Sequence, residues 1–340
     1  MKAMVFDGPG SVSLRDLPPE GPGPGEVLVR VAACGVCGTD LHIHHGEEGS
    51  AAVRPPVVLG HEFAGVVARL GEGVAGLREG DAVAIDPNRY CGECAFCRVG
   101  KKQLCERLTA VGVNRDGGFA ETCRVPASLC HRIDPSVPLE VAALAEPLSC
   151  CLHGIDRAGI RPGDSVCVVG GGSIGLMMVQ LARLAGASAV VLSEPRARQR
   201  AVGLSLGATA AADPLREDLA AVVREAAGTD GVDIVLECAG RPEATAQAFS
   251  VAKRGASLLL FSVPKPGATH PLDLMDVFRK ELRIAGSFIN PDTFSRAVRL
   301  IESGAVRLAP LVTHRFPLDR LEEAFRMQAA PESIKVVVVP

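Results

Sequence analysis

The stretch Val166-Cys167-Val168-Val169-Gly170-Gly171-Gly172-Ser173-Ile174-Gly175 decides the fold of the second half of the chain. A short Val-rich run leads straight into three glycines, and a helical pattern follows as far as Ala185. This order matches G-x-G-x-x-G, the turn between the first strand and the first helix of a dinucleotide-binding unit. The three spaced glycines allow a tight turn, close approach of the pyrophosphate and close packing of helix on strand. The helix N-terminus then faces the phosphates with its positive dipole end. The candidate coenzyme contacts in this turn are Gly170, Gly172, Ile174 and Gly175.

The residues that follow alternate between short apolar runs and helical segments rich in Ala, Leu and Arg. Such alternation predicts β-α-β units and a parallel sheet that is buried on both faces. The predicted strands after the first are Ala189–Leu192, Asp233–Leu236 and Ser257–Phe261.

Glu194 follows the second predicted strand, about 20 positions after Gly175, where dinucleotide sites carry a carboxylate for the adenosine ribose. A carboxylate there accepts hydrogen bonds from the ribose hydroxyls and repels a 2′-phosphate, which favours NAD over NADP. Arg196, Arg198 and Arg200 follow at once; they either hold a phosphate or form a solvated helix face. We add Arg198, Ser262 and Val263 to the expected coenzyme contacts.

The composition fits a two-domain enzyme better than a nucleic-acid or membrane protein. A chain of 340 residues is long for one domain, and 47% of it is apolar. The net charge of −3 gives no general attraction to nucleic acid or anionic lipid. No apolar run is long enough to span a bilayer, and the N-terminus reads as a strand, not a signal peptide. We therefore expect a cytoplasmic protein.

Four of the twelve cysteines lie within 15 residues, as Cys91-x2-Cys94-x2-Cys97-x7-Cys105. Such short spacings let one loop surround a tetrahedral ion, and in a reducing compartment clustered cysteines more often bind metal than form disulfides. The alternative, four unrelated buried thiols, does not suit a stretch with so many charged residues. The pattern predicts a structural zinc with four thiolate ligands. A site of this kind has no open position for catalysis.

Three further motifs carry candidate ligands for a second metal: Cys37-Gly38-Thr39-Asp40-Leu41-His42, Gly60-His61-Glu62 and Glu146-Pro147-Leu148. Taken singly, each has a plain structural explanation. Cys37 and His61 could be packed in a core, and Glu146 could be an exposed charge. The apolar neighbours of Glu146 instead favour a buried, partnered carboxylate.

Taken together, these motifs resemble the zinc-containing medium-chain dehydrogenase/reductase family over essentially the whole chain. The Glu146 motif is similar to the polyol (sorbitol-type) and threonine dehydrogenase branches, and Cys37–Ile43 looks most like the threonine dehydrogenases. The resemblance implies an α/β fold with a discontinuous β-rich GroES-like catalytic domain and a Rossmann domain with a doubly wound parallel sheet. We expect the first to comprise residues 1–148 and 288–340, and the second residues 149–287.

The resemblance also implies a catalytic zinc held by Cys37, His61 and Glu62, with water, Glu146 or substrate in the remaining position. The sequence leaves open whether Glu62 or Glu146 is the resting ligand. Zinc acidifies a bound oxygen, and nicotinamide accepts the hydride. Thr39 is the candidate first proton carrier. His42 is the candidate second carrier, because histidine as a residue type titrates near neutrality. His44 and His45 lie close behind it, so His42 could instead be one of several loop histidines.

The predicted reaction is hydride transfer between NAD and a secondary alcohol. The polar run from His42 to Glu48 favours a sugar alcohol, cyclitol or vicinal diol. L-Threonine is the second candidate substrate, although its dehydrogenases usually carry a Trp in this region and this chain has none. Two further functions compete with this one: a zinc-free quinone or enoyl reductase on the same fold, and a zinc-ribbon protein that binds nucleic acid. The resemblance implies a homo-oligomer built on the nucleotide-binding domain, with a tetramer favoured over a dimer.

Overall fold

The alternating strands after residue 164 form one six-stranded parallel sheet in the computed structural model, which describes residues 1–18, 20–47 and 52–340. The strand order β13-β12-β11-β14-β15-β16 is that of a Rossmann sheet, as predicted. The order reverses between β11 and β14, so the glycine turn after β11 stands at the switch point. The strands are Ser165–Val169 (β11), Ala189–Ser193 (β12), Ala210–Ala212 (β13), Val232–Glu237 (β14), Ala252–Leu260 (β15) and Arg283–Gly286 (β16).

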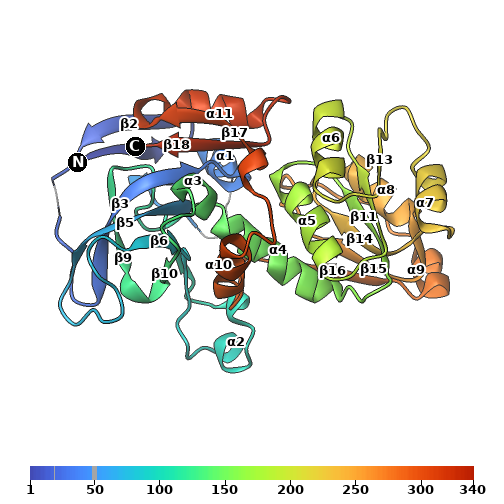
Figure 1. The fold of residues 1–340 in the computed structure, drawn as a ribbon, viewed down its shortest axis with the longest axis horizontal. Helices are drawn as coiled ribbons and strands as arrows, with labels where there is room; N and C mark the ends of the chain where they lie inside the picture. The colour runs from blue at the N-terminus through green and yellow to red at the C-terminus, as the bar shows by residue number, and fades with distance from the viewer. Residues whose placement is uncertain (19, 48–51) are drawn as a thin grey trace. The chain divides into compact units, whose positions relative to one another are not determined.

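Helices cover both faces of this sheet because its central strands are apolar on both sides; every residue of β11 and β12 is buried. In Figure 1, α5 and α6 lie on one side of the strands and α7, α8 and α9 on the other. Local sequence sets several helix ends. Asp218 accepts a hydrogen bond from the amide of Ala220 at the start of α7, and Gly228, with φ 69°, ends it. The helices are Ser173–Leu184 (α5), Ala197–Ser205 (α6), Leu219–Ala227 (α7), Pro242–Ser250 (α8) and Leu274–Lys280 (α9).

The remaining residues form a β-rich unit. A seven-stranded sheet has the order β10-β6-β5-β3-β18-β17, and β9 also pairs with β3. Smaller sheets join β2-β1-β4 and β7-β8. The strands are Lys2–Gly8 (β1), Ser11–Asp16 (β2), Glu26–Gly35 (β3), Val57–Val58 (β4), Glu62–Leu70 (β5), Ala82–Ile85 (β6), Asn88–Arg89 (β7), Thr109–Ala110 (β8), Thr122–Pro126 (β9), Cys130–Arg132 (β10), Val312–Pro317 (β17) and Lys335–Val339 (β18).

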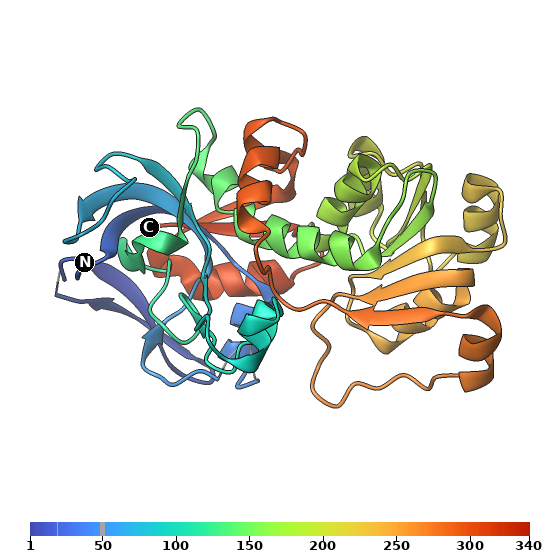
Figure 2. The same cartoon turned by 90° about the horizontal axis from the view of Figure 1, so that it is seen from below.

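The β-rich unit is discontinuous, as predicted, because the C-terminal tail returns to it. Strand β18 pairs antiparallel with β3, matching Val337 with Gly35 and Val338 with Cys34; Figures 1 and 2 show the red strands beside the blue β3. The helices of the β-rich unit are Gly38–His44 (α1), Ala95–Arg98 (α2), Leu139–Ala142 (α3), the start of Ala145–Ala158 (α4), Phe294–Glu302 (α10) and Leu321–Ala329 (α11). Short 3-10 turns lie at Lys102–Leu104, Ala127–Leu129, Ala309–Leu311 and Leu318–Arg320.

The chain divides into Met1–Ser149 with Ile289–Pro340, and Cys150–Phe288. Each division lies one residue after the boundary expected from sequence. Within the β-rich unit, both division points are joined by one buried polar network. Asn290, which is fully buried, donates from Nδ2 to Ser149 Oγ (2.8 Å) and to Asp86 Oδ1 (3.2 Å). Its Oδ1 accepts from Asn88 Nδ2 at 2.6 Å, so both N–H donors of the amide and one of the two acceptor positions on its oxygen are used.

Asp86 in this network generates a prediction about stability. Burial raises the pKa of Asp86 to about 6, although hydrogen bonds from Asn88 and Asn290 oppose the rise. When the pKa of an acid is higher in the folded than in the unfolded state, the acid stabilises the fold at pH values below its unfolded pKa. That contribution is lost as the pH rises through its folded pKa. A pKa rise of this size corresponds to roughly 3 kcal/mol in the free energy of unfolding. The contribution is therefore lost between about pH 4 and pH 6.

Asp86→Asn should consequently raise the melting temperature at pH 7.5, because the amide keeps an acceptor oxygen and removes the desolvated charge. The gain relative to the parent chain should shrink toward pH 4.5, and differential scanning fluorimetry across this range measures it. A variant that melts below the parent at pH 7.5 would contradict this account of Asp86.

Candidate functional site

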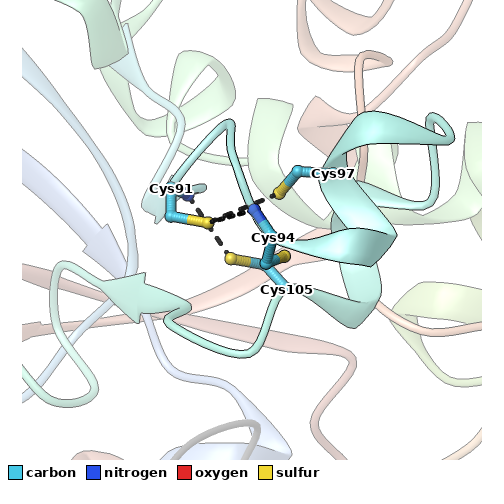
Figure 3. Close-up of side chains that lie close together, drawn as sticks. All are labelled: Cys91, Cys94, Cys97 and Cys105. Carbon is cyan, nitrogen blue, oxygen red and sulfur yellow. Dashed lines mark hydrogen bonds between the residues drawn. The ribbon is translucent and has the colours of Figure 1, made fainter.

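The four clustered cysteines lie in the loop between β7 and β8, within the β-rich unit. Figure 3 shows their side chains converging from α2 and the flanking turns. The four sulfur atoms all lie within 4.8 Å of one another, and Cys91 Sγ and Cys97 Sγ are 3.9 Å apart. A zinc–sulfur bond of about 2.3 Å in a tetrahedron requires sulfur–sulfur edges of about 3.8 Å. The spacing therefore fits a single zinc ion.

Backbone amides prepare this loop for thiolates. The amide of Cys94 donates to Cys91 Sγ (3.3 Å), and those of Cys91 and Arg107 donate to Cys105 Sγ (3.3 and 3.4 Å). Hydrogen bonds from the amides of Glu93 and Cys94 lower the pKa of Cys91 to about 6. Burial raises the pKa of Cys97 to about 12. One thiolate thus forms readily, and a bound cation would offset the cost of ionising the others.

The second group of candidate ligands consists of Cys37, His61 and Glu62. Cys37 caps α1, while His61 and Glu62 stand at the start of β5. One donor atom from each lies within 4.8 Å of the others. His61 and Glu62 are buried, at 6% and 1% exposure. Buried titratable groups this close normally require a shared counter-ion.

Two residues outside the predicted ligand set, Asp40 and Lys335, complete this group. Asp40 is fully buried; its Oδ2 accepts from the amide of Cys37 at 2.8 Å, and its Oδ1 lies 3.5 Å from His61 Nδ1. Lys335, 2% exposed on β18, contacts Glu62 Oε2 through Nζ and donates to the carbonyl of Val36 at 2.9 Å. A Cβ at Gly35 would overlap Glu62 Oε2, so this close approach requires glycine.

The donor set of this group fits a divalent cation. One thiol, one imidazole and two carboxyl groups converge here beside a single ammonium, that of Lys335. Burial opposes a charge on His61, yet Asp40 and Cys37 outweigh it and raise the pKa of His61 well above its usual value. The surroundings therefore favour positive charge at this ring. A zinc ion at Nε2 would supply that charge, while Asp40 orients the ring from Nδ1.

The other residues predicted to take part in catalysis are Glu146, Thr39 and His42. Glu146, in the first turn of α4, is 6% exposed, and its carbonyl accepts from Ser149 Oγ at 2.6 Å. It is not part of the three-ligand group. Thr39 and His42 both lie on α1, three residues apart, and His42 Nδ1 contacts the carboxylate of Glu47. Glu48, at the end of the predicted polar run, lies outside the described residues.

In the glycine turn of the Rossmann unit, Gly170 and Gly175 are required by backbone conformation and close packing, whereas Gly172 borders open space. Gly170 has φ 103°, a conformation that favours glycine. A Cβ at Gly175 would overlap the carbonyl of Gly170, whereas the position above Gly172 is open. Gly172 also caps α5, so the open space faces a helix N-terminus, where backbone amides bind phosphate.

The remaining candidate coenzyme contacts lie just after β12, just after β15 and on α6. Glu194, 2% exposed at the end of β12, accepts from the amide of Gly171 at 2.7 Å. Ser262 Oγ contacts the carboxylate of Glu237, and Val263 is 61% exposed. Arg198 is exposed on α6. Arg196, which is not among the contacts predicted from sequence, binds the Glu194 carboxylate directly.

Comparisons with known proteins agree with both units. Residues 23–135 match the alcohol dehydrogenase GroES-like domain, and residues 173–303 match the zinc-binding dehydrogenase domain. L-Threonine 3-dehydrogenase of Caldanaerobacter subterraneus subsp. tengcongensis is 35% identical over 94% of this chain and 92% of its own length. The 2-dehydro-3-deoxy-L-galactonate 5-dehydrogenase of Pseudoalteromonas atlantica is 35% identical over 93% of this chain and 92% of its own. A zinc-binding dehydrogenase from Sinorhizobium meliloti 1021, solved bound to NADP, is 40% identical, with a TM-score of 0.95 over 100% of this chain and 99% of that one.

The chain therefore belongs to the zinc-containing medium-chain dehydrogenase/reductase family. It is a zinc-dependent alcohol dehydrogenase that uses a nicotinamide dinucleotide, as the sequence predicted. The match across both units leaves no support for a zinc-ribbon protein that binds nucleic acid.

Cys97→Ser should remove the structural zinc, because a hydroxyl is a far weaker zinc ligand than a thiolate. We expect zinc content, measured by mass spectrometry, to fall from two ions to one per subunit, and the melting temperature to fall by at least about 5 °C. Cys130→Ser is the matched control, since Cys130 is a half-buried thiol of the same unit outside the cluster. Two retained ions in Cys97→Ser would show that the cluster does not bind zinc in this way.

Proposed function

We propose that this chain oxidises a hydroxyl-rich secondary alcohol, namely a sugar alcohol, a cyclitol or a vicinal diol, with NAD as the preferred oxidant. The observation that carries the proposal is the group of Cys37, His61 and Glu62, whose donor atoms lie within 4.8 Å of one another and of which His61 and Glu62 are buried. A zinc-free quinone or enoyl reductase on this fold has no use for such a group.

In this proposal Cys37, His61 and Glu62 hold a catalytic zinc, and Glu146 is a further carboxylate that can exchange with Glu62. When bound, zinc acts as a Lewis acid on the alcohol oxygen, and the nicotinamide accepts the hydride. Asp40 fixes the ring of His61, and Lys335 neutralises Glu62 whenever that carboxylate is not a ligand. The Lys335 contact supports the idea that Glu62 can leave the metal.

The proton released from the alcohol must reach solvent through the protein. Thr39 and His42 are one helical turn apart on α1 and therefore lie on one face of it. Thr39 is half-buried, and His42 is nearer the end of the helix with the carboxylate of Glu47 beside it. We propose that the proton passes from Thr39 to His42.

The substrate class rests on polar side chains near the ligands and on one relative. His42 and Glu47 follow Cys37 closely in the chain, and hydrogen-bonding groups of this kind suit several hydroxyls. The Pseudoalteromonas atlantica relative acts, by its name, on a sugar acid. L-Threonine is the second candidate, because the Caldanaerobacter relative is a threonine dehydrogenase of equal identity. The absence of Trp from the chain argues against it.

NAD is the proposed preferred coenzyme because Glu194 stands where a carboxylate discriminates against a 2′-phosphate. The Sinorhizobium meliloti structure holds NADP, which makes both coenzymes necessary in any assay. The glycine turn, Glu194, Ser262 and Val263 would form the binding site, and Arg198 is a further candidate.

We also propose a homo-oligomer, with a tetramer favoured, in the cytoplasm. Strand β16 is the last strand of its sheet, and α9 before it exposes Leu274 and Phe278 at 74% and 77%. These two residues are one helical turn apart and therefore lie on one face of α9. Two copies joined there would cover both the face and the strand edge. Among the described residues, no helix combines the length and the apolar character needed to cross a bilayer.

Activity with a panel of sugar alcohols, cyclitols, vicinal diols and L-threonine tests the substrate and the zinc group together. We expect the highest kcat/KM with a polyol and NAD. Cys37→Ala should reduce turnover at least about 1,000-fold and remove one zinc per subunit while NADH binding survives. Cys34→Ala, which removes a buried thiol three residues away, should keep both activity and metal. Normal turnover by Cys37→Ala would refute the zinc assignment, and a clear preference for L-threonine would replace the substrate class.

Phe278→Glu should shift the protein to a smaller assembly in light scattering coupled to size-exclusion chromatography, because it places a charge in the proposed apolar contact. Leu215→Glu is the control: it makes the same kind of change at a residue that is 79% exposed beside β13, the opposite edge of the sheet. An unaltered assembly in Phe278→Glu would place the contact elsewhere.

A further inference from the structure

The carboxylate of Glu194 is already fully occupied. Its Oε2 accepts from the amide of Gly171 (2.7 Å) and from Arg196 Nη2 (3.2 Å). Its Oε1 accepts from the amide of Arg196 (3.0 Å) and from Arg196 Nε (2.6 Å). An ionised carboxylate offers about four acceptor positions, and these bonds use all of them. A ribose hydroxyl can therefore donate to Glu194 only where the Arg196 guanidinium gives way.

Arg196 also cancels the charge on which exclusion of a 2′-phosphate depends. Burial alone would raise the pKa of Glu194, but hydrogen bonds from Arg196 and from the amide of Gly171 outweigh it and lower the pKa. The carboxylate is therefore ionised at neutral pH, with a guanidinium forked across both of its oxygens. A phosphate approaching this pair meets an adjacent cation and not an isolated anion.

The three arginines after Glu194 differ in their freedom to meet a ligand. Arg200 is held in place, because its Nη1 donates to the carbonyls of Glu194 and Pro195, both at 2.7 Å, and lies 3.3 Å from Asp213 Oδ2. Arg198 is exposed on α6. Arg196 combines direct contact with Glu194 and a side chain that is 34% exposed. It can therefore turn from the carboxylate toward a ligand without unfolding any backbone.

We propose that Arg196 sets the coenzyme specificity of this chain, by neutralising Glu194 and by supplying the cation that binds a 2′-phosphate, so that NADP(H) is bound as well as NAD(H). With NAD(H), the guanidinium turns outward and the ribose hydroxyls replace it on Glu194. With NADP(H), it turns to the phosphate and shields it from Glu194. This inference rests on the proposed dinucleotide site and specifies how that site selects its ligand.

Direct binding measurements test the inference without knowledge of the alcohol. We would measure Kd for NADH and NADPH by nicotinamide fluorescence, and for AMP and adenosine 2′,5′-bisphosphate by calorimetry. The parent chain should bind NADPH within about tenfold of NADH. Arg196→Ala should weaken NADPH and the bisphosphate at least about tenfold, because an unpaired Glu194 then faces the phosphate, and should leave NADH and AMP within about threefold. Glu194→Gln should shift the ratio of NADPH affinity to NADH affinity in the opposite direction, toward NADPH.

Arg224→Ala is the matched control, since it also removes one positive charge from an exposed ion pair of the same unit, with Asp230. Arg196→Lys keeps the charge without the fork and should retain most of the NADPH affinity, which separates electrostatics from a folding defect. An unchanged NADPH/NADH ratio in Arg196→Ala would overturn the inference, as would a loss of NADPH affinity in Arg198→Ala alone. A parent chain that binds neither dinucleotide would instead refute the proposed function itself.

Discussion

The buried charge cluster around Cys37, His61 and Glu62 is the constraint on which the β-rich unit depends. The side chains of Asp40, His61, Glu62 and Lys335 are withdrawn from water. Buried ionisable groups of this kind are stable only when they are paired with one another or with a metal ion. The fold meets this demand from distant segments. Strand β18 brings Lys335 to Glu62 at the position where it pairs with β3, and Gly35 leaves room for that contact. The return of the C-terminal tail is therefore part of the chemistry as well as of the fold.

Close packing also constrains the glycine turn of the Rossmann unit. The carbonyl of Gly170 occupies the position of a side chain at residue 175, and the Glu194 carboxylate lies against Gly171. The turn that we propose for phosphate binding thus also fixes the carboxylate that we propose for the ribose, because the amide of Gly171 donates to Glu194.

Much of the fold and part of the candidate site could be predicted from local sequence patterns. The strand–glycine–helix order identified the Rossmann unit because the steric requirements of that turn involve residues close in sequence. The four-cysteine spacing indicated a metal loop for the same reason. Asp40 could also have been recognised, since it stands three residues after Cys37 in a helix-capping position. Arg196 was harder to single out from the sequence. Arg196, Arg198 and Arg200 alternate from the N-cap of α6 onward, and the sequence alone does not tell which of them binds the carboxylate of Glu194.

The sequence by itself determined the class of fold, the four thiolates of the cysteine loop, the glycine turn and the pool of titratable residues from which a catalytic site could be drawn. Only the tertiary structure decided that Cys37, His61 and Glu62 form one group apart from Glu146, that Lys335 balances Glu62, and that Arg196 occupies the carboxylate of Glu194. The physical reason is that electrostatic partnership depends on distance through space. Local spacing fixes turns and caps, whereas the pairing of β18 with β3 brings Lys335 to Glu62, and side-chain conformation decides that Arg196 meets Glu194.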